Sequence, residues 1–346
     1  MKKSSALLLG LLLSCLPLFA NDGCEMLCIG TYGGHIYRYN FNLRNGAFTA
    51  YDTISTPDAS FITLGGMGNL FWVNETDGAP GISCGSSGEN KVLRRLGNIG
   101  ESPCHVYYDW NRDLVLTAEY GGGSLSVFSL DEDYCLKERI QHIEYGPGSH
   151  IHQICALDDE YILASDLGKD KIRVLRFEGN TLVETGLDLD CGRGSGPRHL
   201  ALDKKNHCVY CICELSDEVL RIGLGMDLEP SLEITQRICG AAVKAGGSAD
   251  IHIHPDGKHL YASHRLQGDG ISVYKIEGGK LIPAGFVKTG KHPRNFHITR
   301  DGRYLLVACR DSKCVEVYKI NKRTGIPSFV SKLSFDQDKP VCIIPF

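Results

Sequence analysis

The sequence predicts an all-β fold, a seven-bladed β-propeller built from four-stranded antiparallel blades. Short runs of alternating apolar and polar residues dominate the chain, its 40 glycines suit many tight turns, and one local pattern recurs seven times. Alternation over about four to eight residues is the pattern of a half-buried strand. Helical periodicity is weak throughout, which leaves an all-β architecture.

Individual strands are easiest to see in four segments that are rich in Val, Ile, Leu, Phe and Tyr. They are residues 124–130 (SLSVFSL), 171–177 (KIRVLRF), 270–276 (GISVYKI) and 314–320 (CVEVYKI). Gly, Asp and Asn residues separate these segments from their neighbours, as expected for turns between strands. We therefore expect many short strands joined mainly by hairpins.

The repeat consists of a turn, an apolar strand, a second turn and a second strand that ends in a polar residue. Its reference position falls on Ser60, Cys104, His152, Arg198, Ala249, Arg294 and Val341, and successive copies are 44 to 51 residues apart. Repeats of about 45 residues that contain several strands are typical of propeller blades. The last copy is cut short at Phe346, so we expect strands near residues 25–32 and 35–41 to complete it and close the ring.

The chain ends allow a simple domain division. Residues 1–20 (MKKSSALLLGLLLSCLPLFA) combine two lysines, an apolar run and a small residue at Ala20, the pattern of a secretory leader. Residues 21–346 then form a single propeller domain. A periplasmic or extracellular location follows, and a lipid anchor at Cys15 is the alternative processing route. No later apolar stretch reaches the roughly 20 residues of a spanning helix.

Charge and cysteine content exclude several classes of protein. The net charge of −4 comes without any basic stripe, which argues against nucleic acid as a partner. Most of the 15 cysteines lie within apolar runs, such as Cys208, Cys211 and Cys213, and we expect them to be buried thiols. The Cys208-x-x-Cys211 spacing has no partner pair, so neither a zinc site nor a redox site is expected there.

Hairpin geometry predicts where the polar residues of the repeat meet. The start of the first strand and the end of the second lie at the same edge of an antiparallel pair. The first strand of each repeat is expected to line a central channel. Arg198 and Glu214, sixteen residues apart, should therefore meet at one rim. The same rim is expected to carry His152, Arg265, Arg294, Glu75, Glu119, Asp166 and Arg310.

These residues lie in stretches that closely resemble the seven-bladed propeller lactonases, a family of 6-phosphogluconolactonases and carboxymuconate lactonizing enzymes. The similar stretches include IGTYGG, GPRHLA, CELSDEV, IHPDGKHLYASHRLQGDGISVY and GKHPRNFHITRDGRYLLVACRDSKCVEVY, and the resemblance extends from about residue 28 to the C terminus. It implies a metal-free hydrolase, or a cycloisomerase, that acts on small anionic lactones without a cofactor. Cys213, His264 and Arg310 stand where the family often has Asn, Asn and Gln, and these changes concern the substrate rather than the fold.

The resemblance also implies a catalytic set of one His, two Arg and one Glu. By motif these are His152, Arg198, Glu214 and Arg265, with His150 as the alternative histidine. We take Glu214, His152 and Arg198 as catalytic candidates. The candidates for substrate binding are Arg265, Arg294, His150, His199 and Glu119. Strand alternation points Arg198, rather than its neighbour His199, at the groove.

Each candidate also has a structural interpretation. Arg198 and Glu214 could form an ion pair that joins two strands of one blade, and His152 could be a buried histidine with a structural role. Arg265 and Arg294 could cap neighbouring turns. In a lactonase, Glu214 or His152 would activate water. Arg198 would stabilise the oxyanion or bind an anionic group of the substrate.

Other motifs are less informative about function. The Gly121–Gly122–Gly123 run precedes a strand rather than a helix, which favours a hairpin turn over a phosphate site. His252 and His254 lack a third ligand, and no Gly-x-Ser-x-Gly elbow is present. We therefore expect no metal and no cofactor. The expected partner is a small lactone, and the expected state is a monomer or weak dimer. A non-catalytic ligand-binding or protein-binding propeller and a carboxymuconate-type cycloisomerase are the alternatives.

Overall fold

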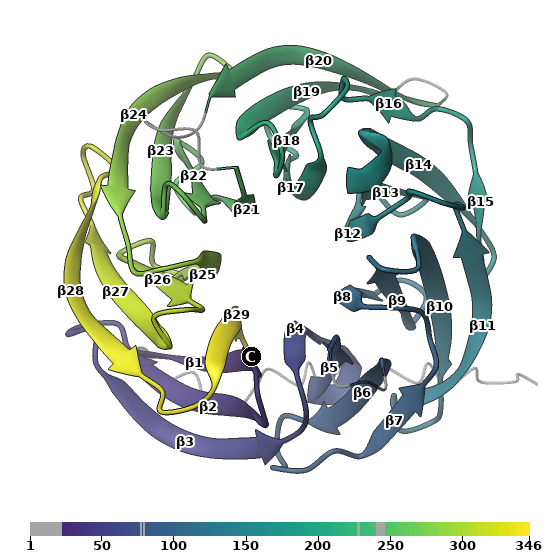
Figure 1. Ribbon diagram of the computed structural model, residues 1–346, viewed down its shortest axis with the longest axis horizontal. Coiled ribbons are helices and arrows are strands. Elements are labelled where there is room, and N and C mark those ends of the chain that lie inside the picture. The colour runs from purple at the N-terminus through teal and green to yellow at the C-terminus, as the bar shows by residue number, and fades with distance from the viewer. Residues whose placement is uncertain (1–22, 77, 79, 227–228, 240–245) are drawn as a thin grey trace, which may run out of the picture.

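The computed structural model describes residues 23–346, apart from 77, 79, 227–228 and 240–245, as a ring of seven β-sheets (Figure 1). This ring confirms the predicted seven-bladed propeller. Helical structure in the described part is limited to two 3-10 turns, η1 (Gly66–Gly68) and η2 (Leu167–Lys169). Among the described residues, no helix is long and apolar enough to cross a membrane. The expected leader, with Cys15, lies outside the described residues.

All seven sheets are antiparallel, and six of them follow one another along the chain without interruption. The first three sheets contain β29 (Lys339–Pro345), β1 (Cys24–Tyr32), β2 (His35–Asn42) and β3 (Phe48–Ser55); β4 (Ala59–Leu64), β5 (Asn69–Asn74), β6 (Gly81–Ser86) and β7 (Arg94–Gly97); and β8 (Pro103–Asp109), β9 (Leu114–Glu119), β10 (Ser124–Leu130) and β11 (Leu136–Glu144). The next two contain β12 (Ile151–Ala156), β13 (Tyr161–Asp166), β14 (Lys171–Glu178), β15 (Thr181–Glu184) and the short β16 (Leu189–Asp190); and β17 (Pro197–Asp203), β18 (Cys208–Cys213), β19 (Glu218–Met226) and β20 (Pro230–Cys239). The last two contain β21 (Ser248–Ile253), β22 (His259–His264), β23 (Gly270–Glu277) and β24 (Lys280–Lys288); and β25 (Pro293–Ile298), β26 (Tyr304–Cys309), β27 (Cys314–Ile320) and β28 (Pro327–Ser334).

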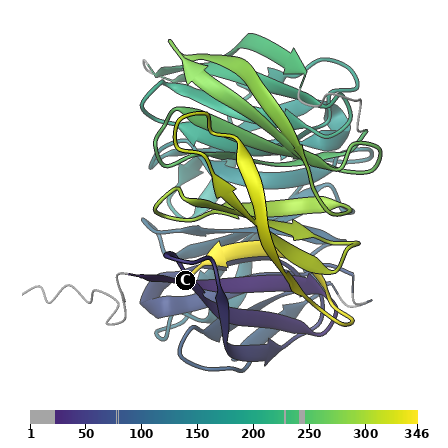
Figure 2. The same cartoon turned by 90° about the vertical axis from the view of Figure 1, so that its left-hand side faces the viewer.

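The two ends of the chain share one blade, as the truncated last repeat predicts. Strand β29 pairs antiparallel with β1, from Leu27 opposite Pro345 to Tyr32 opposite Lys339. Figure 2 shows the C-terminal strand lying beside the N-terminal strands. Because this pairing closes the ring, each of the seven blades has a neighbouring blade on either side.

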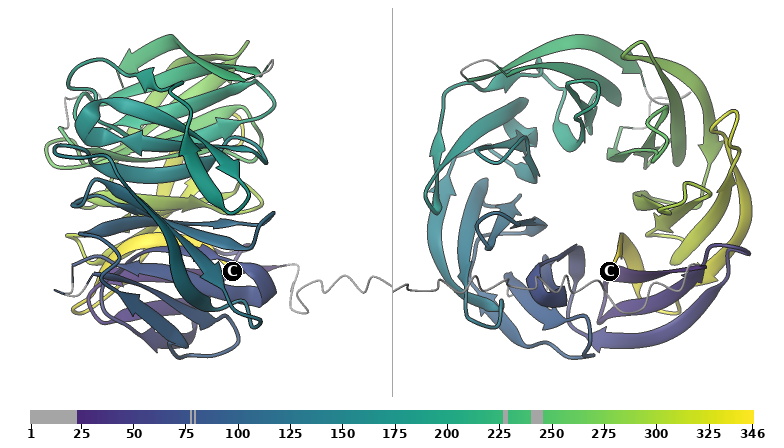
Figure 3. Two further views of the ribbon diagram at one scale, coloured as in Figure 1. Left: turned by 90° about the vertical axis from the view of Figure 1, so that its right-hand side faces the viewer. Right: turned by 180° about the vertical axis from the view of Figure 1, so that it is seen from behind.

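The innermost strand of each blade carries a β-bulge at the same place in the repeat. These strands are β29, β4, β8, β12, β17, β21 and β25, and they surround the central axis in both face views (Figures 1 and 3). The register skips Ser60, Cys104, His152, Arg198, Ala249 with Asp250, Arg294 and Val341. These positions match the reference position of the sequence repeat. We call the end of the ring that carries them the bulge rim.

Apolar side chains between neighbouring blades hold the ring together. In one cluster, Leu163 and Val174 of the β12–β15 sheet pack with Val209 and Leu220 of the β17–β20 sheet. All four are almost fully buried. Complete burial of such a side chain contributes about 1.5–3 kcal/mol to folding. Comparable clusters join the other neighbouring sheets, so each blade is fixed by the two beside it.

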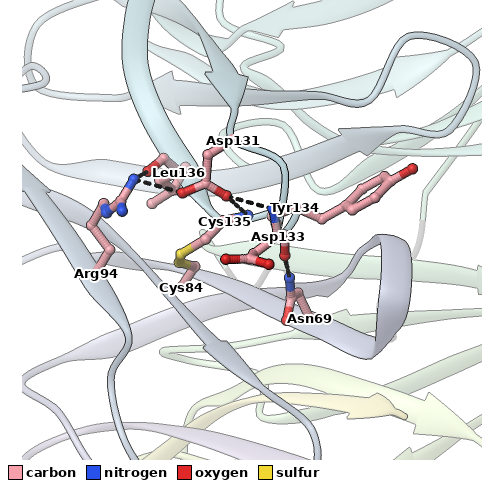
Figure 4. Close-up of a disulfide and its surroundings, with 8 residues drawn as sticks. All are labelled: Asn69, Cys84, Arg94, Asp131, Asp133, Tyr134, Cys135 and Leu136. Atoms are coloured by element: carbon pink, nitrogen blue, oxygen red, sulfur yellow. Dashed lines mark hydrogen bonds and ion pairs between the residues drawn. A yellow bond between two sulfur atoms is a disulfide. The ribbon is translucent and has the colours of Figure 1, made fainter.

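One disulfide adds a covalent link between two neighbouring blades (Figure 4). It joins Cys84 in β6 to Cys135, which directly precedes β11. Around it, Arg94 forms an ion pair with Asp131 at 2.9 Å, and the Asn69 amide donates to two carbonyl groups of the same turn, each at 2.9 Å. Most of the other described cysteines are buried thiols, as predicted.

Replacing both Cys84 and Cys135 by serine is expected to lower the free energy of unfolding by about 2–4 kcal/mol, because the disulfide restricts the unfolded chain. Urea denaturation followed by circular dichroism measures this loss. The native spectrum should be retained, since the apolar contacts between blades remain. An unchanged free energy of unfolding would contradict a formed disulfide.

Candidate active site at the bulge rim

The centre of the site is a carboxylate shared by two arginines. Arg198 Nε lies 2.8 Å from Glu214 Oε2, and Arg265 Nη2 lies 2.9 Å from the same oxygen. Arg198 is the bulged residue of β17, whereas Glu214 follows directly after β18. The backbone N–H of Glu214 donates to the carbonyl of Gly196 at 2.7 Å, which holds the two strand ends together. The predicted meeting of Arg198 and Glu214 at one rim is therefore observed.

A second ion pair lies across the ring closure. Arg294 Nη2 is 3.4 Å from Glu75 Oε2, and the Tyr32 hydroxyl donates to the same oxygen at 2.7 Å. The Arg294 guanidinium also lies over the Tyr32 ring, 5.2 Å from its centroid. The two ion pairs bring together three arginines and two carboxylates. Their formal charges sum to +1, so this part of the rim favours an anion.

The three cations influence the ionisation of their neighbours. Burial, followed by the nearby Arg198, lowers the pKa of Arg265 to about 9. Burial alone would raise the pKa of Glu214, but Arg198 and Arg265 outweigh it and hold that pKa below its ordinary value. Glu214 is therefore ionised at neutral pH. A bound anion would relieve the repulsion between the arginines.

His152 lies beside this group as a neutral, buried imidazole. It is 4% exposed, and its Nδ1 has no hydrogen-bond partner among the described residues. Burial and the adjacent Arg198 hold its pKa well below the ordinary value for histidine. A buried nitrogen without a partner is costly unless a water molecule or substrate binds it. His152 is thus placed to contact a ligand at the rim.

His150, the alternative histidine, is committed to its own neighbourhood. Its Nδ1 lies 2.8 Å from the carbonyl oxygen of Tyr120, and its ring stacks on the Tyr120 ring at 4.4 Å. The His152 ring meets the Tyr120 ring edge-on, with the two ring centroids 5.8 Å apart. The structure places His152, rather than His150, next to the arginines.

His199 also points toward the central axis, contrary to the alternation argument. The bulge at Arg198 interrupts the alternation, so both residues reach the interior of the ring. The His199 ring lies 5.1 Å from that of His152, and its Nδ1 lies 2.7 Å from Asp250 Oδ1. Asp250 thereby orients His199 and leaves Nε2 without a hydrogen-bond partner among the described residues.

Asp250 is a buried carboxylate that the sequence did not single out. Its Oδ2 lies 2.9 Å from His252 Nε2 and accepts a hydrogen bond from the Asn295 amide at 2.7 Å. Burial would raise its pKa, but His252 and His199 outweigh burial and hold the pKa well below its ordinary value. Its position in the repeat could have identified Asp250 from the sequence, because Asp250 follows a reference residue just as His199 does.

His292 is a second residue that the sequence analysis missed. Its Nε2 lies 3.3 Å from Arg265 Nη1, and its Nδ1 lies 3.5 Å from Asp311 Oδ2. Burial and the adjacent Arg265 lower its pKa to about 3. His292 therefore supports Arg265 without adding positive charge. Arg310, expected at the same rim, donates its backbone N–H to the His292 carbonyl at 3.0 Å, and its guanidinium pairs with Asp311 at 2.7 Å.

Glu119 and Asp166 do not belong to this group, so their expected place at the open rim is wrong. Glu119 is fully buried within its blade and accepts hydrogen bonds from Thr117 and from Ser124. Asp166 is fully buried as well, and it pairs with Arg173 at 2.7 Å.

The cause is a shift of one residue. Glu119 and Asp166 are the last residues of β9 and β13, whereas Glu214 and Arg265 come one position after the ends of β18 and β22. Because side chains alternate along a strand, a shift of one residue sends them to a different side of the sheet.

Aromatic and imidazole side chains gather near the central axis next to His152. The Phe61 ring lies 4.3 Å from that of His105 and 6.0 Å from that of His199, and the two histidine rings are 6.2 Å apart. His105 and Phe61 also line a cavity of about 450 Å³ together with Tyr107, Gln153 and Ile344. This cavity belongs to the other end of the innermost strands. The ring cluster of Phe61, His105 and His199 therefore lies between it and the bulge rim.

The fold and rim together define a propeller with a buried, arginine-rich candidate site. A sequence model of the family described as "Lactonase, 7-bladed beta-propeller" matches residues 26–345. The chain belongs to this family of lactonases, as the resemblance of its motifs predicted.

Two named relatives and one solved structure show the extent of the similarity. A 6-phosphogluconolactonase of Photorhabdus laumondii is 31% identical over 245 residues, which are 70% of this chain and 74% of the relative. A 6-phosphogluconolactonase of Bacillus subtilis is 28% identical over 300 residues, 79% of this chain and 83% of the relative. The crystal structure of a candidate 6-phosphogluconolactonase from Bacteroides uniformis is 34% identical, with a TM-score of 0.86 over 94% of this chain and 100% of the other.

The buried position of Glu119 leads to a prediction about stability. Burial raises its pKa in the folded chain from 4.5 to about 7, so the stability associated with its proton is complete below pH 4.5 and is lost as the pH rises through 7. Glu119→Gln is neutral at every pH. It should raise the free energy of unfolding at pH 8 by up to about 3 kcal/mol, with a much smaller gain at pH 5.

Urea denaturation at pH 5 and pH 8 measures the difference. Lactonase activity serves as the control, because Glu119 lies outside the rim group and the variant should keep it. Equal effects at the two pH values would contradict a raised pKa.

Proposed function

We propose that this protein hydrolyses small anionic sugar-acid lactones at the bulge rim. The observation that carries the proposal is the convergence of Arg198 and Arg265 on one oxygen of Glu214, beside the unpartnered Nδ1 of His152. The names of the two 6-phosphogluconolactonase relatives support a sugar lactone as the substrate class. The excess positive charge of the rim supports an anionic substituent, so 6-phosphogluconolactone should be preferred to gluconolactone.

In the proposed reaction, Glu214 acts as the base. Both arginines make their shortest contact with Oε2, and no hydrogen bond between the described residues ends at Oε1. Oε1 is thus available to take a proton from a water molecule as its oxygen attacks the lactone carbonyl carbon. The Nδ1 of His152 would accept a hydrogen bond from the same water and orient it. The pKa of Glu214, held low by its arginines, keeps the carboxylate ionised before each cycle.

The arginines would stabilise the charges of the substrate and of the tetrahedral intermediate. Arg198 donates to the carbonyl oxygen as it becomes an oxyanion, while Arg265 and Arg294 bind the anionic substituent. When the intermediate collapses, the bond from the acyl carbon to the ring oxygen breaks. Glu214 then returns its proton to that oxygen, which yields the open hydroxy acid and restores the carboxylate.

A cycloisomerase of the carboxymuconate type is the second candidate, because the three rim arginines could bind two substrate carboxylates. The carboxymuconate reaction changes a diene and therefore alters the ultraviolet absorbance. Hydrolysis of a sugar lactone involves no diene and leaves this absorbance unchanged. Ultraviolet absorbance with a carboxymuconate substrate therefore separates the two activities. A ligand that binds tightly by calorimetry without any turnover would favour the non-catalytic propeller instead.

We also propose that the chain is exported. The leader pattern of residues 1–20 and the disulfide between Cys84 and Cys135 support export, since disulfides form in oxidising compartments. Because 6-phosphogluconolactone belongs to cytosolic metabolism, an exported enzyme would act on a different lactone of the same class. N-terminal sequencing of the mature protein tests cleavage after Ala20 and the alternative at Cys15.

Glu214→Gln is expected to lower kcat for lactone hydrolysis by about 10²–10⁴-fold, because the amide cannot take a proton from water. Arg198→Ala should lower it by about 10²–10³-fold through loss of oxyanion stabilisation. Acid release from 6-phosphogluconolactone, corrected for spontaneous opening, measures both effects.

Glu119→Gln is the matched carboxylate control for this experiment and should keep its activity. Circular dichroism verifies that each variant is folded. If the wild-type chain opens several lactones no faster than buffer does, the protein is not a lactonase of this class.

The lowered pKa of Arg265 predicts a pH dependence of binding. Its cation is complete at pH 7.5 and is lost as the pH rises through about 9. The dissociation constant of 6-phosphogluconate, the open product, should therefore rise about fourfold between pH 7.5 and 9.5. Calorimetric titration measures it. Arg265→Gln should bind more weakly at pH 7.5 and lose this pH dependence, so a persistent dependence would assign it to another group.

A further inference from the structure

Cys309 and Cys314 face each other across the hairpin that joins β26 to β27. Cys309 is the last residue of β26 and Cys314 the first of β27, and they are direct partners in the antiparallel register. They are the one such cysteine pair in the strand registers of the described residues. Directly opposed residues have Cα atoms about 4.5–5.5 Å apart. That spacing lies within the range of about 4.4–6.8 Å that a disulfide requires.

The sulfur atoms themselves are close. The two Sγ atoms and a carboxylate oxygen of Glu316 all lie within 4.8 Å of one another. Cys309 Sγ is 3.6 Å from Glu316 Oε2. Contact with the Cys309 thiol lowers the pKa of Cys314, and the same contact, burial and the Glu316 carboxylate raise the pKa of Cys309. Cys314 is therefore the better nucleophile of the pair.

The same three residue types could hold a metal, but the surroundings favour a disulfide. Glu316 Oε2 already accepts hydrogen bonds from the Gly290 backbone N–H at 2.9 Å and from the Tyr318 hydroxyl at 2.6 Å. A Cβ atom at Gly290 would lie 3.1 Å from both Cys309 Cβ and Glu316 Oε1, so this side of the cluster is closely packed. A metal would have to displace these contacts. A disulfide adds no atom.

We propose that Cys309 and Cys314 are a site of disulfide formation, closed by a small-molecule disulfide such as oxidised glutathione or by a disulfide oxidoreductase. The Cys314 thiolate attacks one sulfur of the donor, forms a mixed disulfide and releases one thiolate. Cys309 passes its proton to the Glu316 carboxylate and attacks the Cys314 sulfur, which releases the second donor thiolate. The two cysteines lose two electrons and two protons, and the donor is reduced to two thiols.

The new bond would tie the base of a turn that contacts the candidate site. The turn contains Asp311, whose Oδ2 lies 3.5 Å from His292 Nδ1, and His292 Nε2 lies 3.3 Å from Arg265 Nη1. A closed disulfide therefore fixes the strand ends from which Asp311 holds His292. The proposal itself concerns the two thiols and does not depend on the reaction at the rim.

Peptide mapping tests the proposed disulfide. Trypsin cleaves after Arg310 and Lys313, which lie between the two cysteines, so each cysteine falls in a separate peptide. The full chain is incubated with oxidised glutathione, alkylated in denaturant without reduction, and digested with trypsin. A disulfide leaves the peptides 304–310 and 314–319 joined, two hydrogen atoms lighter than their sum, and reduction separates them. The Cys84–Cys135 peptides are the positive control. The peptide of Cys104, a free thiol about as buried as the pair but with no cysteine opposite it in the strand register, should remain alkylated.

Cys309→Ser is the matched variant. It should abolish the joined peptides while keeping the native circular dichroism spectrum, and it should melt at a lower temperature than the oxidised wild-type chain. Recovery of both Cys309 and Cys314 as alkylated thiols, beside a joined Cys84–Cys135 pair, would overturn the proposal. A glutathione adduct that persists on Cys314 would also overturn it. Metal-dependent protection from alkylation without joined peptides would assign the pair to metal binding instead.

Discussion

The pairing of β29 with β1 is the interaction on which the rest of the molecule depends. It places the last strand of the chain innermost in the first blade and so completes the wall around the central axis. The site depends on the same closure. Tyr32 at the end of β1 and Glu75 after β5 meet Arg294 from β25, on the other side of the closing blade. Without the closing strand, the blades that carry these three groups would not be held next to one another.

The seven bulges explain how a uniform ring can carry a specific site. Each innermost strand is interrupted at the same height, and each interruption turns side chains toward the axis. Three of the reference positions hold a histidine or an arginine, His152, Arg198 and Arg294, whereas others are small or apolar, such as Ala249 and Val341. The fold therefore requires the bulge but not the identity of the residue within it. The chemistry of the site can vary while the blades remain the same.

The fold was largely predictable from the sequence because it repeats. The spacing of the copies and the truncated last repeat were enough to predict seven blades and their closure, and hairpin geometry brought Arg198 to Glu214. Prediction failed where one residue of register mattered. Glu119 ends its strand and turns into the blade, whereas Glu214 lies one position beyond its strand and reaches the rim.

Contacts between blades were the other part that the sequence did not show. His199 meets Asp250 and Arg265 meets His292 across neighbouring blades, and Cys84 is bonded to a cysteine 51 residues away. Such partners share no local pattern, because only the packing of two blades brings them together. The direction of His199 was also hidden, since an unpaired residue in the strand breaks the alternation on which the sequence argument relied.

The ring cluster of Phe61, His105 and His199 has a consequence for molecular traffic. Because these rings meet between the bulge rim and the cavity toward the other end of the axis, they narrow the passage between the two. A ligand that enters at the bulge rim is then expected to leave at the same rim, past the same three arginines. Departure of a negatively charged product is then opposed by the attraction that brought its precursor in, and dissolved salt, by screening that attraction, hastens its exit.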